Sequence, residues 1–154
     1  MPKVNQLTVP CENRPGSLAR ITTVLGEAEV NIVGFLLSTV KAKCYVKLIV
    51  DDVEKAKEAL YDAELPYFET VVLHARLLNV PGALGRLAGR LAAKNINITL
   101  GYQTIEKDSK RASVVLEVSN LEQAARASRM SPSEQIYALS RRRQGTLFVA
   151  PHPD

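Results

Sequence analysis

Two short segments of the chain combine residues that can bind an anion through main-chain groups. Each reads proline, glycine, a small residue and leucine, first at positions 15–18 and again at positions 81–84. A Pro-Gly turn that opens a helix leaves the first helical amides without intrahelical partners, and the helix dipole adds partial positive charge there. Because glycine has no Cβ, a ligand can approach this backbone closely. Both segments therefore suit a carboxylate or a phosphate.

The expected donors are main-chain amides in the first turn of each helix, those of Ser17, Leu18, Ala83 and Leu84. Asn13 and Asn79 each stand two residues before the proline. Either side chain can cap its helix, or its oxygen can bind the ammonium group of a ligand. A single Pro-Gly helix start is also ordinary structural punctuation, so one copy alone does not indicate a binding site.

The two segments belong to a longer internal repeat. Pro81 follows Pro15 by 66 positions, and the pair Asn31-Ile32 returns at the same offset as Asn97-Ile98. We expect the two asparagines to end helices, because asparagine tolerates the left-handed conformation found there. Two copies in phase favour a chain built from two similar units.

Hydrophobic periodicity predicts the elements that position the first segment. Alternation predicts a strand over residues 4–11, and Pro15 stands where a helix begins, with φ already set and no amide hydrogen to lose. Apolar residues recur at helical spacing from Leu18 to Ala28, with Arg20 on the expected solvated flank. Further on, the chain predicts strands at 32–40 and 44–50, a helix at 53–63 and an extended segment at 68–78. This order is the split βαβ pattern of the ferredoxin-like sandwich.

The second unit repeats this order. Its helix uses Leu84, Leu87 and Leu91, with Arg86 on the flank, and strands are expected at 96–105 and 112–118. Beyond the polar tip at 106–111 the repeat offset grows from 66 to 68, so the second hairpin is two residues longer.

The predicted fold is α+β, with two tandem βαββαβ copies of the ferredoxin-like sandwich. The first unit occupies residues 1–73 and the second 74–154, with a C-terminal extension from about 131. In that extension the repeat favours a closing strand at 135–140, followed by an extra strand at 146–150. A capping-box pattern at 131–134 favours instead a helix through residue 143.

The composition is that of an ordinary globular protein: 154 residues, 46% hydrophobic and 23% charged, with a net charge of +4. No stretch reaches the ~20 apolar residues of a membrane span, and the first residues form no secretion signal, so we expect a cytoplasmic protein. Cys11 and Cys44 match no metal or redox spacing, and we expect buried, reduced thiols rather than a structural disulfide or a nucleophile. The arginines at 141–143 form either a solvated surface or a contact for an anionic partner.

Both units resemble the ACT domain, a family of small βαββαβ regulatory modules that bind amino acids. The likeness rests on residues 13–18 with 30–32, and on residues 79–84 with 95–98, and it extends from residue 4 to about 130. It implies an amino acid held where two units meet, by the strand–turn–helix segment of one and the second strand of a neighbour. The residues implied to bind ligand are Asn13, Pro15, Gly16, Ser17, Leu18, Asn31, Ile32, Asn79, Pro81, Gly82, Ala83, Leu84, Asn97 and Ile98.

The leading hypothesis is a free-standing amino-acid sensor that acts in trans on an enzyme or a regulator protein. The resemblance implies a homodimer or a higher homo-oligomer, and no cofactor, membrane or nucleic acid is expected. An RNA-binding module of the same topology would stack bases on aromatic residues of its third strand, but 44–50 and 112–118 offer one tyrosine and none. A purely structural interaction module is the other alternative. An enzyme is not expected, because His74 and His152 have no implied catalytic or metal-binding partners.

Overall fold

The computed structural model describes residues 3–105 and 110–129. The chain divides into two compact units, with the boundary between Val72 and Leu73. No helix in the described ranges is long and apolar enough to cross a membrane. Every prediction beyond residue 130, including both strands, the alternative helix, the arginines at 141–143 and His152, lies outside the described residues.

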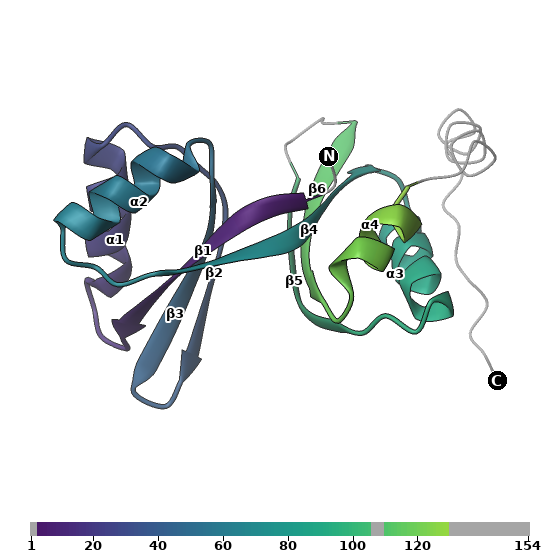
Figure 1. Cartoon of the computed structure of the whole chain (residues 1–154), viewed down its shortest axis with the longest axis horizontal. Coiled ribbons are helices and arrows are strands. Elements are labelled where there is room, and N and C mark those ends of the chain that lie inside the picture. The colour runs from purple at the N-terminus through teal and green to yellow at the C-terminus, as the bar shows by residue number, and fades with distance from the viewer. Residues whose placement is uncertain (1–2, 106–109, 130–154) are drawn as a thin grey trace. The chain divides into compact units, whose positions relative to one another are not determined.

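The first unit has the predicted order of elements. It runs through β1 (Lys3–Glu12), α1 (Ser17–Glu27), β2 (Ile32–Val40), β3 (Lys43–Val50), α2 (Val53–Asp62) and the first residues of β4 (Phe68–Leu78). Its strands lie in the order β2-β3-β1-β4, and β3 is antiparallel to both β1 and β2. The two helices lie together beside the strands (Figure 1). The unit is therefore α+β with a βαββαβ pattern.

A single hydrophobic core holds these helices against the sheet. Alternate residues of β1, Leu7 and Val9, are fully buried in it together with Ile21 and Leu25 of α1 and Leu60 of α2. Full burial of one such side chain stabilises the fold by about 1.5–3 kcal/mol. Buried residues recur every two positions in β1 and every three or four positions in the helices, because only these positions face the core.

The two helices that follow the Pro-Gly segments start differently from the prediction. α1 begins at Ser17 and its N-cap is Gly16, with φ 91°, while α3 (Ala83–Ala93) has Gly82 as N-cap, with φ 84°. A left-handed residue cannot belong to the helix, so Pro15 lies before the first turn rather than in it. At both helices the N-cap is a glycine, which has no side chain to act as a cap. The side chain of Asn13 donates to Lys41 O instead, so the capping role considered for Asn13 is wrong, while the one considered for Asn79 stays a prediction.

The helices also end earlier than predicted. The left-handed residue after α1 is Glu29, with φ 58°, and the one after α3 is Asn95, with φ 56°. The amide of Val30 donates to Leu25 O at 2.9 Å and that of Glu29 to Gly26 O at 3.0 Å, which is the Schellman pattern. Val30 must follow the left-handed residue directly, because it packs back into the core. The prediction that Asn31 and Asn97 supply the left-handed conformation is therefore wrong.

The second unit contains the rest of β4, then α3, β5 (Ile98–Ile105), β6 (Arg111–Val118) and α4 (Leu121–Ala127). Its strands lie in the order β4-β6-β5. The pairing Leu7↔Leu48 of the first unit returns as Leu73↔Leu116, at offsets of 66 and 68. The extra residues of the second hairpin therefore fall in its tip and leave the register unchanged.

The two cysteines form a disulfide that the sequence did not predict. Cys11 and Cys44 are register partners on β1 and β3, their Cα atoms lie 5.0 Å apart, and their sulfurs are bonded. The expectation of two reduced thiols is wrong. Their separation of 33 residues carries no signal, because the pairing of two strands, and not chain spacing, brings the sulfurs together.

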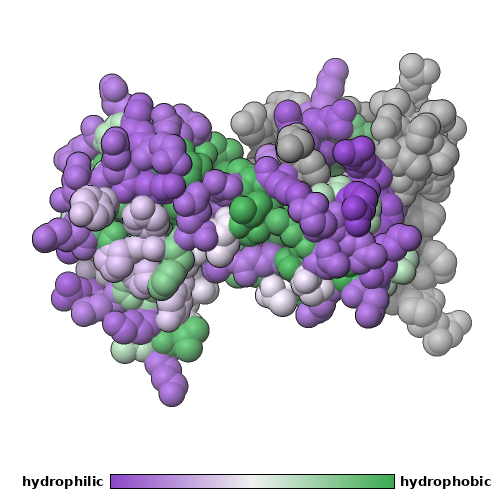
Figure 2. Space-filling view, viewed as in Figure 1, coloured by the Kyte–Doolittle hydropathy of each residue, from purple (hydrophilic) through white to green (hydrophobic). Residues whose placement is uncertain are grey.

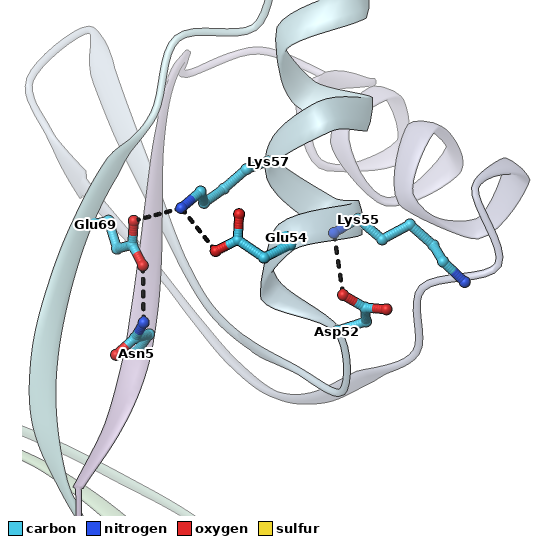
Figure 3. A network of polar contacts seen from close by, with 6 residues as sticks. All are labelled: Asn5, Asp52, Glu54, Lys55, Lys57 and Glu69. Atoms are coloured by element: carbon cyan, nitrogen blue, oxygen red, sulfur yellow. Dashed lines mark hydrogen bonds and ion pairs between the residues drawn. The ribbon is translucent and has the colours of Figure 1, made fainter.

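A polar network fixes α2 to β1 and β4 (Figure 3). Lys57 donates to Glu54 and to Glu69 at 3.0 Å each, and Asn5 of β1 donates to the other carboxylate oxygen of Glu69 at 2.8 Å. The hydrogen bonds from Lys57 to Glu54 and Glu69 raise the pKa of the lysine. At the start of α2 the side chain of Asp52 accepts from the amide of Lys55 at 3.0 Å and so caps the helix.

Candidate functional site

An open pocket lies at the first Pro-Gly corner, between the end of β1 and the start of α1. Its volume is about 570 Å³. The lining residues come from β1, the corner, the first turns of α1 and the loop after α2: Pro10, Cys11, Glu12, Arg14, Pro15, Gly16, Ser17, Arg20, Ile21, Glu64, Leu65 and Pro66. At Gly16, apart from its two chain neighbours, no atom of the described residues lies within 4 Å of the position that a Cβ would take. The main chain is therefore accessible to a ligand at this point.

Hydrogen bonds on both sides hold the corner in place. The hydroxyl of Ser17 donates to the carbonyl of Glu12 at 2.7 Å, which closes the loop on itself. The amide of Asn13 donates to Ala42 O at 2.9 Å, and its side-chain nitrogen donates to Lys41 O at 3.4 Å, in the turn between β2 and β3. The position of the corner therefore depends on β3 as well as on β1.

The two expected amide donors are not equivalent. The amide of Ser17 donates to Arg14 O across the turn, but at 3.4 Å, beyond the usual range. Leu18 stands in the first turn of α1, where an amide has no partner within the helix. The second unit repeats the weak turn bond, from the amide of Ala83 to Val80 O at 3.3 Å. Leu18 is consequently the better main-chain donor of the two at the first corner.

Side chains of both charges line the pocket. Arg14 lies 3.6 Å from Glu12, and both side chains are mostly exposed, 70% and 64%. Arg20 reaches across to the carbonyl of Ala63 at 3.5 Å, and Glu64 lies on the opposite side, in the loop after α2. An exposed ion pair contributes at most ~1 kcal/mol, so these groups can exchange their present partners for the two ends of a zwitterion.

The structure brings together only part of the predicted ligand set. Pro15, Gly16 and Ser17 line the pocket. Asn31 and Ile32 lie beyond the far end of α1, which at 11 residues spans roughly 16 Å. The amide of Asn31 donates to the Asp51 carboxylate at 2.9 Å, and the equivalent amide of Asn97 donates to the Ser119 hydroxyl at 2.9 Å. One unit alone therefore does not unite the seven residues predicted for it.

Several lining residues were not among the predicted ligands. Arg14 and Arg20 stand inside the repeated segment, and their positive charge could have identified them as candidates for binding a carboxylate. Another three, Glu64, Leu65 and Pro66, lie far from the motif in sequence, in the loop after α2, and only the folded structure brings them to the corner. Leu65 donates its amide to Leu60 O at 2.9 Å in a second Schellman turn, with Glu64 in the left-handed conformation at φ 56°. This turn forms the wall that faces α1.

The second corner is covered by its own helix. A Cβ on Gly82 would lie 2.9 Å from Nη1 of Arg86, so the guanidinium lies over the glycine. The other guanidinium nitrogen, Nη2, is buried and has no hydrogen-bond partner among the described residues. The amide of Asn79 donates to Lys110 O at 3.0 Å, and Leu84 is 46% exposed. Unlike Gly16, Gly82 is therefore not open to a ligand unless Arg86 moves.

A second open pocket, of about 690 Å³, lies beyond the end of α2 and shares Glu64, Leu65 and Pro66 with the first. No group of three or more His, Cys, Asp or Glu side chains in residues 3–105 and 110–129 can hold a metal ion. Burial in β4 lowers the pKa of His74, and the positive charge of Arg76 lowers it further. Burial raises the pKa of Tyr102, with Glu117 adding to the shift.

Comparison with known proteins places a family domain in the first unit. The ACT domain family matches residues 6–64, from β1 through the open corner to the loop after α2. A search of curated proteins finds no match. The chain is similar in structure to protein BT0572 from Bacteroides thetaiotaomicron, with 28% identity and a TM-score of 0.76, over 82% of this chain and 86% of that chain.

Two further solved structures share the fold. One is the regulatory subunit of aspartate kinase from Thermus thermophilus in its ligand-free form, 20% identical, with a TM-score of 0.58, covering 80% of this chain and 89% of that chain. The other is the regulatory subunit of aspartate kinase from Thermus flavus, 16% identical, with a TM-score of 0.54, covering 83% and 91%. At this identity the likeness extends to the fold alone.

Proposed function

We propose that this protein is a regulatory module that binds a free amino acid at the first corner and acts on another protein. The observation that carries the proposal is the open pocket at Gly16, which combines helix-start amides with side chains of both charges. The ACT domain found over residues 6–64 supports a regulatory rather than a catalytic role. We propose no cofactor for this role.

A zwitterion fits the chemistry of this pocket. Its carboxylate would accept hydrogen bonds from the amide of Leu18 at the positive end of α1 and from Arg14 or Arg20. Its ammonium group would lie against the carboxylate of Glu12 or Glu64. A dianionic phosphate would leave these two carboxylates facing like charge, so we favour an amino acid over a phosphate.

We further propose two tandem ACT-like units, residues 1–73 and 74–154, in a cytoplasmic protein that pairs as a homodimer or a higher oligomer. The similarity to BT0572 supports the tandem arrangement, since it covers more of the chain than either unit. β2, which lies at the edge of the first unit's strand order, carries exposed Val33, Phe35 and Leu37. Figure 2 shows hydrophobic residues (green) at the surface among hydrophilic residues (purple). A neighbour joined there would bring its own second strand, and hence Asn31 and Ile32 or Asn97 and Ile98, toward a corner.

The second corner is a weaker proposed site. Asn79, Pro81, Gly82, Ala83 and Leu84 repeat the first set, but the arginine over Gly82 would have to move before a carboxylate could enter. We therefore assign the first binding event to the corner at Gly16.

A thermal-shift panel of the common amino acids tests the proposal. A ligand at a hundred times its dissociation constant stabilises the protein by about 2.7 kcal/mol, which corresponds to roughly 5–11 °C for a chain of this length. The amide and the N-acetyl derivative of any amino acid that gives a shift serve as matched controls, because each lacks one of the two charges. Both derivatives should give no shift. A flat response across the panel would refute amino-acid sensing and leave a purely structural interaction module.

A further inference from the structure

The Cys11–Cys44 disulfide lies directly beside the proposed amino-acid site. Cys11 lines the pocket and immediately precedes Glu12, whose carbonyl accepts the hydrogen bond of Ser17 at 2.7 Å. Cys44 stands two residues after Ala42, whose carbonyl accepts the amide of Asn13 at 2.9 Å. The disulfide therefore links β1 to β3 close to the hydrogen bonds that Ser17 and Asn13 make at the corner.

The two sulfurs differ in access. Cys44 is only 2% exposed, whereas Cys11 is half-buried and faces the pocket. A reductant can consequently approach Cys11 from the pocket but cannot approach Cys44. An amino acid in the pocket would lie in the same path.

Loss of the bond must displace atoms at the pocket wall. Two sulfurs that are no longer bonded have to separate to van der Waals distance. Cys44 is buried whereas Cys11 lines the pocket, so we expect Cys11 and the neighbouring end of β1 to take up the shift. Glu12 and the closing hydrogen bond of Ser17 belong to that same end.

We propose that the Cys11–Cys44 pair is a reversible thiol–disulfide switch that sets the affinity of the first corner for its amino acid. The inference rests on the proposed function of that corner. In the oxidised form the corner keeps the geometry described above and binds the amino acid tightly. In the reduced form the end of β1 is displaced and the amino acid binds weakly. In the proposed cytoplasmic location such a disulfide is more often a redox sensor than a permanent staple.

A dithiol can act as the reductant. One thiolate of the dithiol attacks Sγ of Cys11, forms a mixed disulfide and expels the thiolate of Cys44. The second thiol of the reductant then attacks its own bonded sulfur and releases Cys11 as a thiolate. Two electrons pass to the protein, two protons complete the cysteine thiols, and the reductant becomes a cyclic disulfide. Oxidation reverses each step.

Coupling between the two events must be reciprocal. Reduction should weaken amino-acid binding by at least about fivefold, the lower end of typical coupling between sites. By the same linkage, the bound amino acid favours the disulfide at equilibrium. Because it also covers Cys11, it should slow attack by the reductant.

The experiment uses the full chain in two states, air-oxidised and reduced with dithiothreitol, with each common amino acid as a separate probe. The chain has two cysteines, so thiol titration should count none before reduction and two after it. Isothermal titration with every amino acid that gives a thermal shift then compares affinities in the two states. We expect the affinity to fall at least fivefold on reduction and to return on reoxidation. The double variant Cys11→Ser, Cys44→Ser should bind like the reduced form and ignore dithiothreitol.

The outcomes separate the two proposals. Binding of equal affinity in both states would overturn the switch and leave the sensor in place, even if the melting temperature fell on reduction. Tighter binding in the reduced state, or two free thiols in the oxidised sample, would also overturn the switch. A flat panel in both states would refute the sensor and the switch together. If the serine variant does not fold, the wild-type comparison, checked by circular dichroism in both states, still decides.

Discussion

Substitution of Gly16 tests the corner most directly, because the backbone conformation of Gly16 predicts a loss of stability and the open space beside it predicts a loss of binding. Its φ of 91° is one that only glycine adopts without strain, and a left-handed L-residue costs about 1–2 kcal/mol. Apart from the two chain neighbours, no atom of the described residues lies within 4 Å of the added methyl group, so Gly16→Ala brings no steric cost from the surrounding fold beyond this strain. The expected loss is about 1–2 kcal/mol, or roughly 2–8 °C in melting temperature.

The same methyl group would occupy the pocket where the amino acid is proposed to bind. Thermal unfolding followed by circular dichroism gives the stability, and isothermal titration gives the affinity. Gly82→Ala is the matched control, because its φ of 84° imposes the same strain at the other corner, where only the flexible end of Arg86 must move. Gly26→Ala, inside α1 and with open space around it, should instead stabilise by up to ~1 kcal/mol.

The three variants should therefore separate strain from binding. Gly16→Ala should lose both stability and amino-acid binding, Gly82→Ala stability alone, and Gly26→Ala neither. A melting temperature for Gly16→Ala equal to that of the wild type would refute the left-handed corner. Unchanged affinity in that variant would refute the assignment of the pocket as the binding site.

Further expectations follow from individual side chains. Arg86→Ala should uncover the second corner and raise the amino acid bound per chain from one molecule to two in isothermal titration; a ratio that stays at one would remove that corner as a site. Asp52→Ala and Asn120→Ala each remove a helix N-cap with a 3.0 Å bond and should each cost about 1 kcal/mol in urea unfolding. The pKa of His74 is lowered, so the folded form binds its proton less readily than the unfolded chain, and stability should decline as the pH falls below 6.5. His74→Gln should flatten that slope, and an unchanged slope would assign it to other groups.

Most of the fold could be predicted because local signals and long-range packing agree. The stripe of Ile21 and Leu25 predicted α1, since the same residues fill the core. The helix boundaries were less accurate, because they depend on geometry that residue type only biases. The left-handed position fell on Glu29, a poor candidate by type, since packing of Val30 fixed where the turn had to occur.

The lining of the candidate pocket was predicted only where it is local in sequence. Pro15, Gly16 and Ser17 were found from a contiguous motif, whereas Glu64 comes from a loop that the motif says nothing about. The disulfide was not predicted for the same reason. Cys11 and Cys44 meet through the register of two strands, and spacing rules read only distance along the chain.

The open and the closed corner differ because of a residue outside the shared motif. In the second unit, Arg90 donates to the carbonyl of Ala127 at 2.9 Å, at the C-terminal end of α4, where a cation is favoured. The repeat places Val24 at the equivalent position of α1, and valine cannot make that bond. In the first unit it is Arg20 that reaches the end of the second helix, at Ala63 O, and so turns away from its glycine.

Helix length strengthens this difference. α2 has 10 residues and α4 has 7, so α4 ends one turn sooner. Its terminal carbonyls, those of Ala127 and Ser128, meet Arg90, which lies one turn further along α3 than Arg86. Among the described residues Arg86 has no carbonyl partner like the one that Arg20 has, and its guanidinium lies over Gly82. Two corners with the same Pro-Gly motif thus acquire different accessibility from the length of a neighbouring helix and the presence of one arginine.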